Sequence, residues 1–135
     1  MSKVGYKQKS DAWGTFTKEL SNIQMYESDI ENYKVLKQYA KLINSPEETI
    51  KNYERKSSLL IERVEYINKI LNSLYWKDKE LLIRCYVKRY SNKLAGSKFG
   101  MSDKAVNKRL GCSLKNKVTP ILNMDKLKWG VNYDN

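Results

Sequence analysis

The chain has 135 residues, 41% of them hydrophobic and 30% charged, which leaves room for one domain or for one domain with a helical extension. No apolar run approaches the roughly 20 residues of a membrane-spanning helix, so we expect a cytoplasmic protein without a membrane partner. Histidine is absent, which removes the usual general base and, with only two cysteines, any tetrahedral zinc site. We therefore expect no enzymatic activity, no cofactor and no metal.

The first predicted helix covers residues 26–43. Apolar side chains recur there at spacings of three and four, the period of an amphipathic helix, at Tyr26, Ile30, Tyr33, Leu36, Ala40 and Ile43. A helix-start signal follows, in which Ser45 and Glu48 can form a capping box and Pro46 fits the first helical position. The pattern predicts a second helix from Pro46 onward.

The second predicted helix is longer and more regular. Its apolar seam follows a heptad pattern, at Ile50, Tyr53, Ser57, Leu60, Val64, Ile67, Leu71 and Leu74. A helix over residues 46–74 would be roughly 43 Å long, and such a seam must pack against a partner. One interpretation is an antiparallel hairpin with the preceding helix, and the other is a homodimer through the seam.

We favour the hairpin because the preceding helix is adjacent, carries a matching stripe and is joined by a short turn. The second helix is longer than the first, so the two arrangements can coexist. The sequence thus predicts an all-α chain that begins with a helical arm over residues 1–75, hairpin-like or coiled-coil-like.

Short helices are predicted from Trp76 onward, and the first of them opens at residues 77–80. Its buried face would be Leu81, Leu82, Cys85 and Tyr86. The charge is also concentrated here, because residues 77–118 carry twelve Lys or Arg against three acidic residues, a net +9 of the chain's +11. A local excess of this size is typical of a protein that binds a polyanion.

The centre of this basic segment meets the requirements of a helix-turn-helix. Ser91 can cap its first helix, and Ala95 and Phe99 supply the buried side of that helix. Gly96 lies where the two helices approach most closely, so that only a very small residue fits. Gly100 can adopt the left-handed conformation that ends the helix and turns the chain.

The second helix of the motif is predicted to begin after Ser102, which caps it, with Met101 in the core beside the turn. Its inward stripe would be Val106, Leu110, Leu114 and Val118. Pro120 is expected to limit how far that helix runs. We therefore expect a helix-turn-helix domain over residues 76–122 and a tail over residues 123–135.

The outward face of the second helix carries the candidate site. The N-terminal part of a recognition helix enters the major groove, where Lys can donate to guanine and Asn can bond adenine. We expect base reading from Asp103, Lys104, Asn107 and Lys108, and contacts to DNA phosphates from Lys93, Ser97, Lys98, Ser102, Arg109 and Lys115.

Residues 95–110 resemble the helix-turn-helix of bacterial sigma factor region four, in which an apolar-small-x-x-Leu-Gly-Ile-Ser turn precedes Thr-Val-x-x-Arg-Leu. The stretch Ala105-Val106-x-x-Arg109-Leu110 follows the second half of that pattern. Residues 80–87 are similar to the family's upstream helix. A small basic chain with helices first and such a module last also resembles the ArpU/RinA-type late transcription regulators of Gram-positive phages.

The specific match covers residues 78–118, and two places depart from it. Ala95 is smaller than the usual Ile or Leu, and Gly111 with Cys112 interrupts an otherwise basic helix. We expect this interruption to bend the recognition helix or to end it early.

The resemblance implies a sequence-specific transcription regulator, an activator of phage or mobile-element genes that binds double-stranded DNA and contacts RNA polymerase in the bacterial host cytoplasm. One alternative is a DNA-packaging recognition subunit, small terminase-like, although such subunits usually place the helix-turn-helix first. Another is a module that binds polymerase without reading DNA, which the basic face disfavours.

Overall fold

The computed structural model describes residues 12–125, and all regular secondary structure in this part of the chain is helical. The predicted all-α class is therefore confirmed. The helices in chain order are α2 (Ala12–Ser21), α3 (Ile23–Leu42), α4 (Glu47–Asn72), α5 (Trp76–Leu82), the π-helical η1 (Ile83–Val87), α6 (Asn92–Ser97), α7 (Asp103–Lys108), the π-helical η2 (Arg109–Leu114) and α8 (Lys115–Met124).

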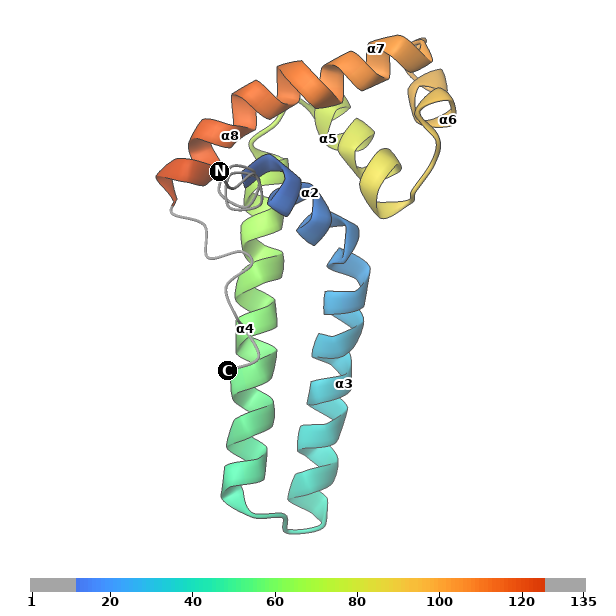
Figure 1. Cartoon of the computed structure of the whole chain (residues 1–135). Helices are drawn as coiled ribbons and strands as arrows, with labels where there is room; N and C mark the ends of the chain where they lie inside the picture. The colour runs from blue at the N-terminus through green and yellow to red at the C-terminus, as the bar shows by residue number, and fades with distance from the viewer. Residues whose placement is uncertain (1–11, 126–135) are drawn as a thin grey trace, which may run out of the picture.

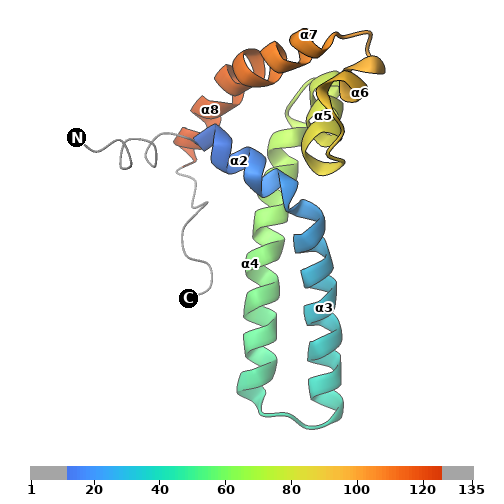
Figure 2. The same cartoon turned by 45° about the vertical axis from the view of Figure 1, so that its right-hand side comes forward.

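Helices α3 and α4 lie side by side and run in opposite directions, and they project from the rest of the molecule (Figures 1 and 2). We call this pair the hairpin and its far end, around residues 40–47, the tip. Asn44 closes the turn at the tip with a φ of 56°. The predicted capping box does not form, because the structure gives no side-chain cap at the start of α4 and Pro46 occupies the N-cap position instead of Ser45.

Burial within the hairpin falls from its base to its tip. Near the base the seam of α4 is buried at Ile67, Leu71 and Leu74. Near the tip, Leu36 and Ile43 remain 40% and 54% exposed, so their predicted place in the hairpin core is wrong. A spacing of three residues turns a helix by about 300°, which displaces these two residues by about 60° from the positions that face α4.

The remaining helices form a compact head at the base of the hairpin. Helix α2, which the sequence did not predict, packs against α8 and η1. Its Phe16 and Leu20 are fully buried in one hydrophobic core with residues near the other end of the described chain, among them Leu114, Val118 and Leu122. Residues 12–21, which we predicted as part of the arm, thus pack with the head. Residues 1–11 of the predicted arm lie outside the described residues.

Segments α7, η2 and α8 follow one another without a break and cross the base of the hairpin, opposite its tip (Figure 1). The interruption expected at Gly111 and Cys112 is a π-helical segment, and it does not end the helix. Pro120 lies inside α8, which continues to Met124, so the expected limit at Pro120 is wrong. The predicted tail thus begins inside a helix, and its residues 126–135 are not described.

A buried polar cluster joins the head to the hairpin. Arg63 of α4 approaches Glu19 of α2 with 2.9 Å between Nη1 and Oε1. Tyr26 of α3 donates its hydroxyl to the same carboxylate oxygen at 2.8 Å and accepts from Arg63 at 3.1 Å. Burial raises the pKa of Tyr26. Each of the three helices α2, α3 and α4 supplies one of the three side chains.

Within residues 12–125 no helix combines the length and the apolar character that crossing a membrane requires.

Candidate nucleic-acid interface

The turn between α6 and α7 depends on two glycines. A Cβ built on Gly96 would lie 2.5 Å from Val106 Cγ2 and 2.8 Å from the carbonyl oxygen of Met101, closer than real Cβ contacts. Gly100 has a φ of +67°, a conformation that disfavours any residue with a side chain. Both predictions are confirmed. The absence of a side chain at Gly96 allows α7 to lie close against α6, and Gly100 allows the chain to turn between them.

Both helices of this pair begin with the predicted serine caps. Ser91 Oγ accepts a hydrogen bond from the backbone N–H of Leu94 at 3.2 Å, and Ser102 Oγ accepts from that of Ala105 at 3.1 Å. The predicted inward stripe is also confirmed, because its four members are buried: Val106, Leu110, Leu114 and Val118. The opposite face of α7 is therefore turned away from the core.

All four side chains that we expect to read bases are exposed on that outward face: Asp103, Lys104, Asn107 and Lys108. The face continues through exposed Gly111 and Cys112 to exposed Lys115. A Cβ on Gly111 would meet nothing within 4 Å, so packing inside the chain does not require glycine there. The outward face thus has two basic ends separated by a stretch of small side chains.

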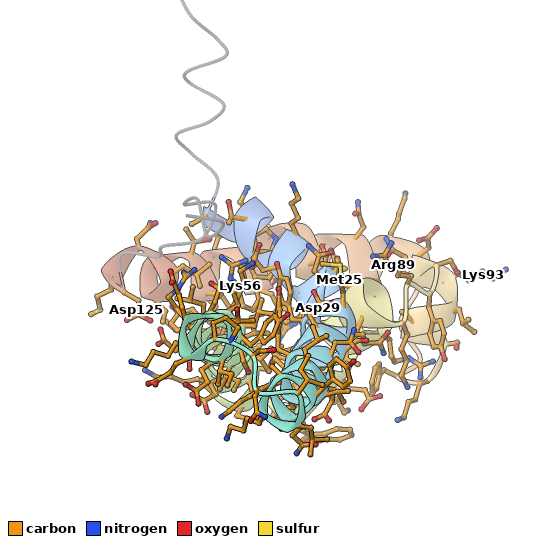
Figure 3. All side chains as sticks on the ribbon, turned by 90° about the horizontal axis from the view of Figure 1, so that it is seen from below. Met25, Asp29, Lys56, Arg89, Lys93 and Asp125 are labelled. Atoms are coloured by element: carbon orange, nitrogen blue, oxygen red, sulfur yellow. The ribbon has the colours of Figure 1, made fainter. Side chains whose placement is uncertain are left out.

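The residues expected to contact phosphates differ in their surroundings. Lys93 and Lys115 are exposed, and Figure 3 places Lys93 at the outer edge of the head, on the opposite side from Asp125. Lys98 is 3.6 Å from Glu80 Oε2, in a contact whose partners are both partly exposed. Pairs of this kind contribute little to stability and leave the ammonium available to a second anion.

The two expected serine contacts already make local hydrogen bonds. Ser97 Oγ donates to the carbonyl oxygen of Leu94 at 2.7 Å, whereas Ser102 Oγ accepts from the backbone as the cap of α7. Both residues are exposed, and both hydroxyls have further hydrogen-bonding capacity.

Arg109 departs from the expectation of a phosphate contact. Its Nε and Nη2 donate to the two carboxylate oxygens of Asp78, at 2.9 and 2.7 Å. Asp78 is only 4% exposed, and these hydrogen bonds raise the pKa of Arg109. A bidentate pair of this kind holds a fixed geometry, so we assign Arg109 to the attachment of η2 to α5 and remove it from the phosphate set.

Sequence reasoning missed Arg84, which positions α6. Its Nε donates to the carbonyl oxygen of Ala95 at 3.1 Å and its Nη2 to that of Leu94 at 3.2 Å. The guanidinium also lies over the Tyr90 ring, 5.0 Å from the centroid. No spacing rule reveals such a contact, because the acceptors are backbone atoms on another helix.

An aromatic pair, exposed Trp76 and partly buried Phe99, borders the same region. Trp76 lies edge-on to Phe99 at 6.3 Å between ring centroids, and Lys77 lies over the Trp76 ring at 5.6 Å from its centroid. Among the residues from 12 to 125, no three His, Cys, Asp or Glu side chains gather in a way that could hold a metal ion.

A scan against protein-family models, a search of curated proteins and a search of solved structures each give no match for this chain.

Proposed function

We propose that residues 91–118 act as a helix-turn-helix that binds double-stranded DNA, with α7 as the recognition helix in the major groove. The observation that carries the proposal is the outward face that runs from α7 through η2 to the start of α8. Lys104, Asn107, Lys108 and Lys115 are exposed there, and the opposite face is buried. A solvated helix needs no such concentration of one charge, and like charges at this spacing repel one another. A polyanion relieves that repulsion.

The groups on this face suit base recognition as well as charge neutralisation. Lys donates to guanine O6 and N7, and the Asn107 amide can bond adenine N6 and N7 together. The small side chains at Gly111 and Cys112 let the helix backbone approach the groove closely.

The chain also resembles sigma factor region four and the ArpU/RinA-type regulators. We therefore propose that it is a transcription regulator that activates phage or mobile-element genes with host RNA polymerase.

The first experiment measures the salt dependence of binding to duplex DNA by fluorescence anisotropy. With the three lysines of the phosphate set, Lys93, Lys98 and Lys115, the slope of log affinity against log salt should be at least as steep as about −2.7, since each phosphate that a lysine neutralises releases about 0.9 counterions. An affinity that does not change with salt would rule out the proposed mode of binding.

A second experiment separates base reading from phosphate contact on a duplex selected from random sequence. Asn107→Ala is expected to cost roughly 1–3 kcal/mol on the selected duplex and to relax preference at one or two base pairs. Lys93→Ala and Lys115→Ala should weaken selected and random duplexes equally. Lys69→Ala, an exposed lysine of α4, is the matched control and should change neither affinity. Equal losses on both duplexes for Asn107→Ala would contradict the base-reading assignment.

A further inference from the structure

The hairpin carries an apolar surface that the described chain leaves largely exposed. Five neighbouring side chains of α3 and its C-terminal end are 40 to 80% exposed, and we call them the tip stripe: Val35, Leu36, Tyr39, Leu42 and Ile43. Their spacing of three and four places them along one side of the helix. Single exposed apolar residues are ordinary, but a contiguous patch marks a contact surface.

Most of the tip stripe lies off the side of α3 that faces α4. The side of α3 that faces α4 is defined by Tyr33, whose ring lies 6.2 Å from that of Tyr53, and by Lys37, which pairs with Glu54 at 2.6 Å. Val35 lies two positions from each of Tyr33 and Lys37. Two positions turn a helix by about 200°, so Val35 points away from α4, as do Tyr39 and Leu42 on the same side of the helix. Leu36 and Ile43 lie at the edge of the stripe, about 60° from the side that faces α4.

The tip stripe also lies far from the head. The hairpin projects from the head with its tip at the opposite end of the molecule (Figures 1 and 2). The buried core of the head includes α4 residues only from Ile67 onward. The tip stripe therefore does not belong to the buried core of the head.

We propose that the tip stripe is a dimer interface, in which it packs against the same stripe of a second copy of this chain about a twofold axis. The argument for a second copy is the available area. Five large side chains at these exposures present about 500 Å² of mostly apolar surface, so two copies together would bury at most about 1,000 Å², the lower limit of a specific interface. A twofold contact uses the same patch on both partners, and one stripe on each copy is therefore sufficient.

This inference is independent of the proposed DNA binding, because the tip stripe and the outward face of α7 share no residue. It differs from the dimer that the heptad seam of α4 suggests, since that seam is buried within the chain at Ile67, Leu71 and Leu74. An interface near the 1,000 Å² limit is weak, so we expect dissociation in the micromolar range rather than an obligate dimer.

The test is sedimentation equilibrium of the full chain without DNA, over protein concentrations from about 5 to 500 µM. The wild-type chain should dimerise, and the double variant Tyr39→Lys with Leu42→Lys should dissociate at least tenfold more readily, because it places like charges across the twofold axis. Both side chains are exposed in the monomer, so circular dichroism should show unchanged helicity. Met124→Lys, which replaces an exposed apolar residue of α8 by the same charge, should dimerise like the wild type.

Two results would overturn the inference. One is a wild-type chain that stays monomeric at the highest concentration, which would leave the tip stripe to a different protein. The other is a dimer that the double variant does not weaken, which would place the interface elsewhere. DNA binding by a single copy is measured separately, so the loss of either proposal leaves the other standing.

Discussion

The head and the tip of the hairpin use apolar side chains in opposite ways. In the head, Phe16 and Leu82 are fully enclosed by residues from both ends of the described chain. At the tip, Leu42 is 80% exposed although its helix is as regular as any in the molecule. Regular helix therefore forms in both regions, but only the head encloses a core. Stability of the fold should reside in the head, and the tip should be free to change.

The largest difference in stability between head and tip is expected when one large side chain is removed from each region. Phe16→Ala should cost about 3–5 kcal/mol in the free energy of unfolding, because it removes a buried ring and leaves a cavity. Leu42→Ala should change it by no more than about 0.5 kcal/mol at protein concentrations low enough to keep the chain monomeric. Urea unfolding followed by circular dichroism measures both. Similar losses for the two variants would contradict the division.

Two glycines of the head offer a matched pair. Gly96→Ala should destabilise the protein by about 1–3 kcal/mol, since its Cβ would collide with the backbone at Met101 as well as with Val106. Gly111→Ala meets open space and should be neutral or stabilising by up to about 1 kcal/mol. Thermal melts of both variants test whether close packing is confined to the inner face of this helix.

The assignment of Arg109 can be sharpened with a substitution that keeps its charge. Arg109→Lys cannot donate two parallel hydrogen bonds to Asp78, so we expect a loss of about 1.5–3 kcal/mol in stability. Lys115→Gln, an exposed position farther along the same continuous helix, should leave the melting temperature unchanged. If Arg109→Lys melted like the wild type and only DNA affinity fell, Arg109 would return to the phosphate set.

The smallest expected effect concerns pH at the junction between head and hairpin. The pKa of Tyr26 is raised above 10.0 in the folded protein, so the folded state retains the phenolic proton longer than the unfolded chain does. Its contribution is fully present below the unfolded value and is lost as pH rises through the folded pKa. Between pH 9 and 11 the melting temperature should therefore fall less steeply in Tyr26→Phe than in the wild type. If the melting temperatures of the two proteins fell in parallel as pH rises, Tyr26 would make no such pH-dependent contribution to stability.

The sequence predicted those parts of the structure that depend on neighbours along the chain. The caps at Ser91 and Ser102 and the glycines at 96 and 100 are set by backbone requirements within a few residues. The all-helical class followed from the same kind of pattern. These features include most of what positions the candidate site.

The errors concern contacts between distant segments. From the sequence, Asp78 is an ordinary acidic residue in the first turn of a helix. Only the folded structure brings it into contact with Arg109, 31 positions away. Helix α2 is a different case, because Trp13, Phe16 and Leu20 follow the spacing of an amphipathic helix. Only its packing against α8 depends on distant segments. Leu36 and Ile43 fit the stripe of an isolated helix, but a single neighbouring helix covers less than the whole stripe.

The contact between α2 and α8 sets the order in which a nascent chain can fold. Residues 22–114 are synthesised between these two helices, which takes about 5–20 seconds at ordinary rates of translation. During this time Phe16 and Leu20 lack the α8 surface that later encloses them. The hairpin, whose partners are adjacent in sequence, can form on the ribosome well before that. Its tip stripe would then be displayed on neighbouring nascent chains before their heads are complete.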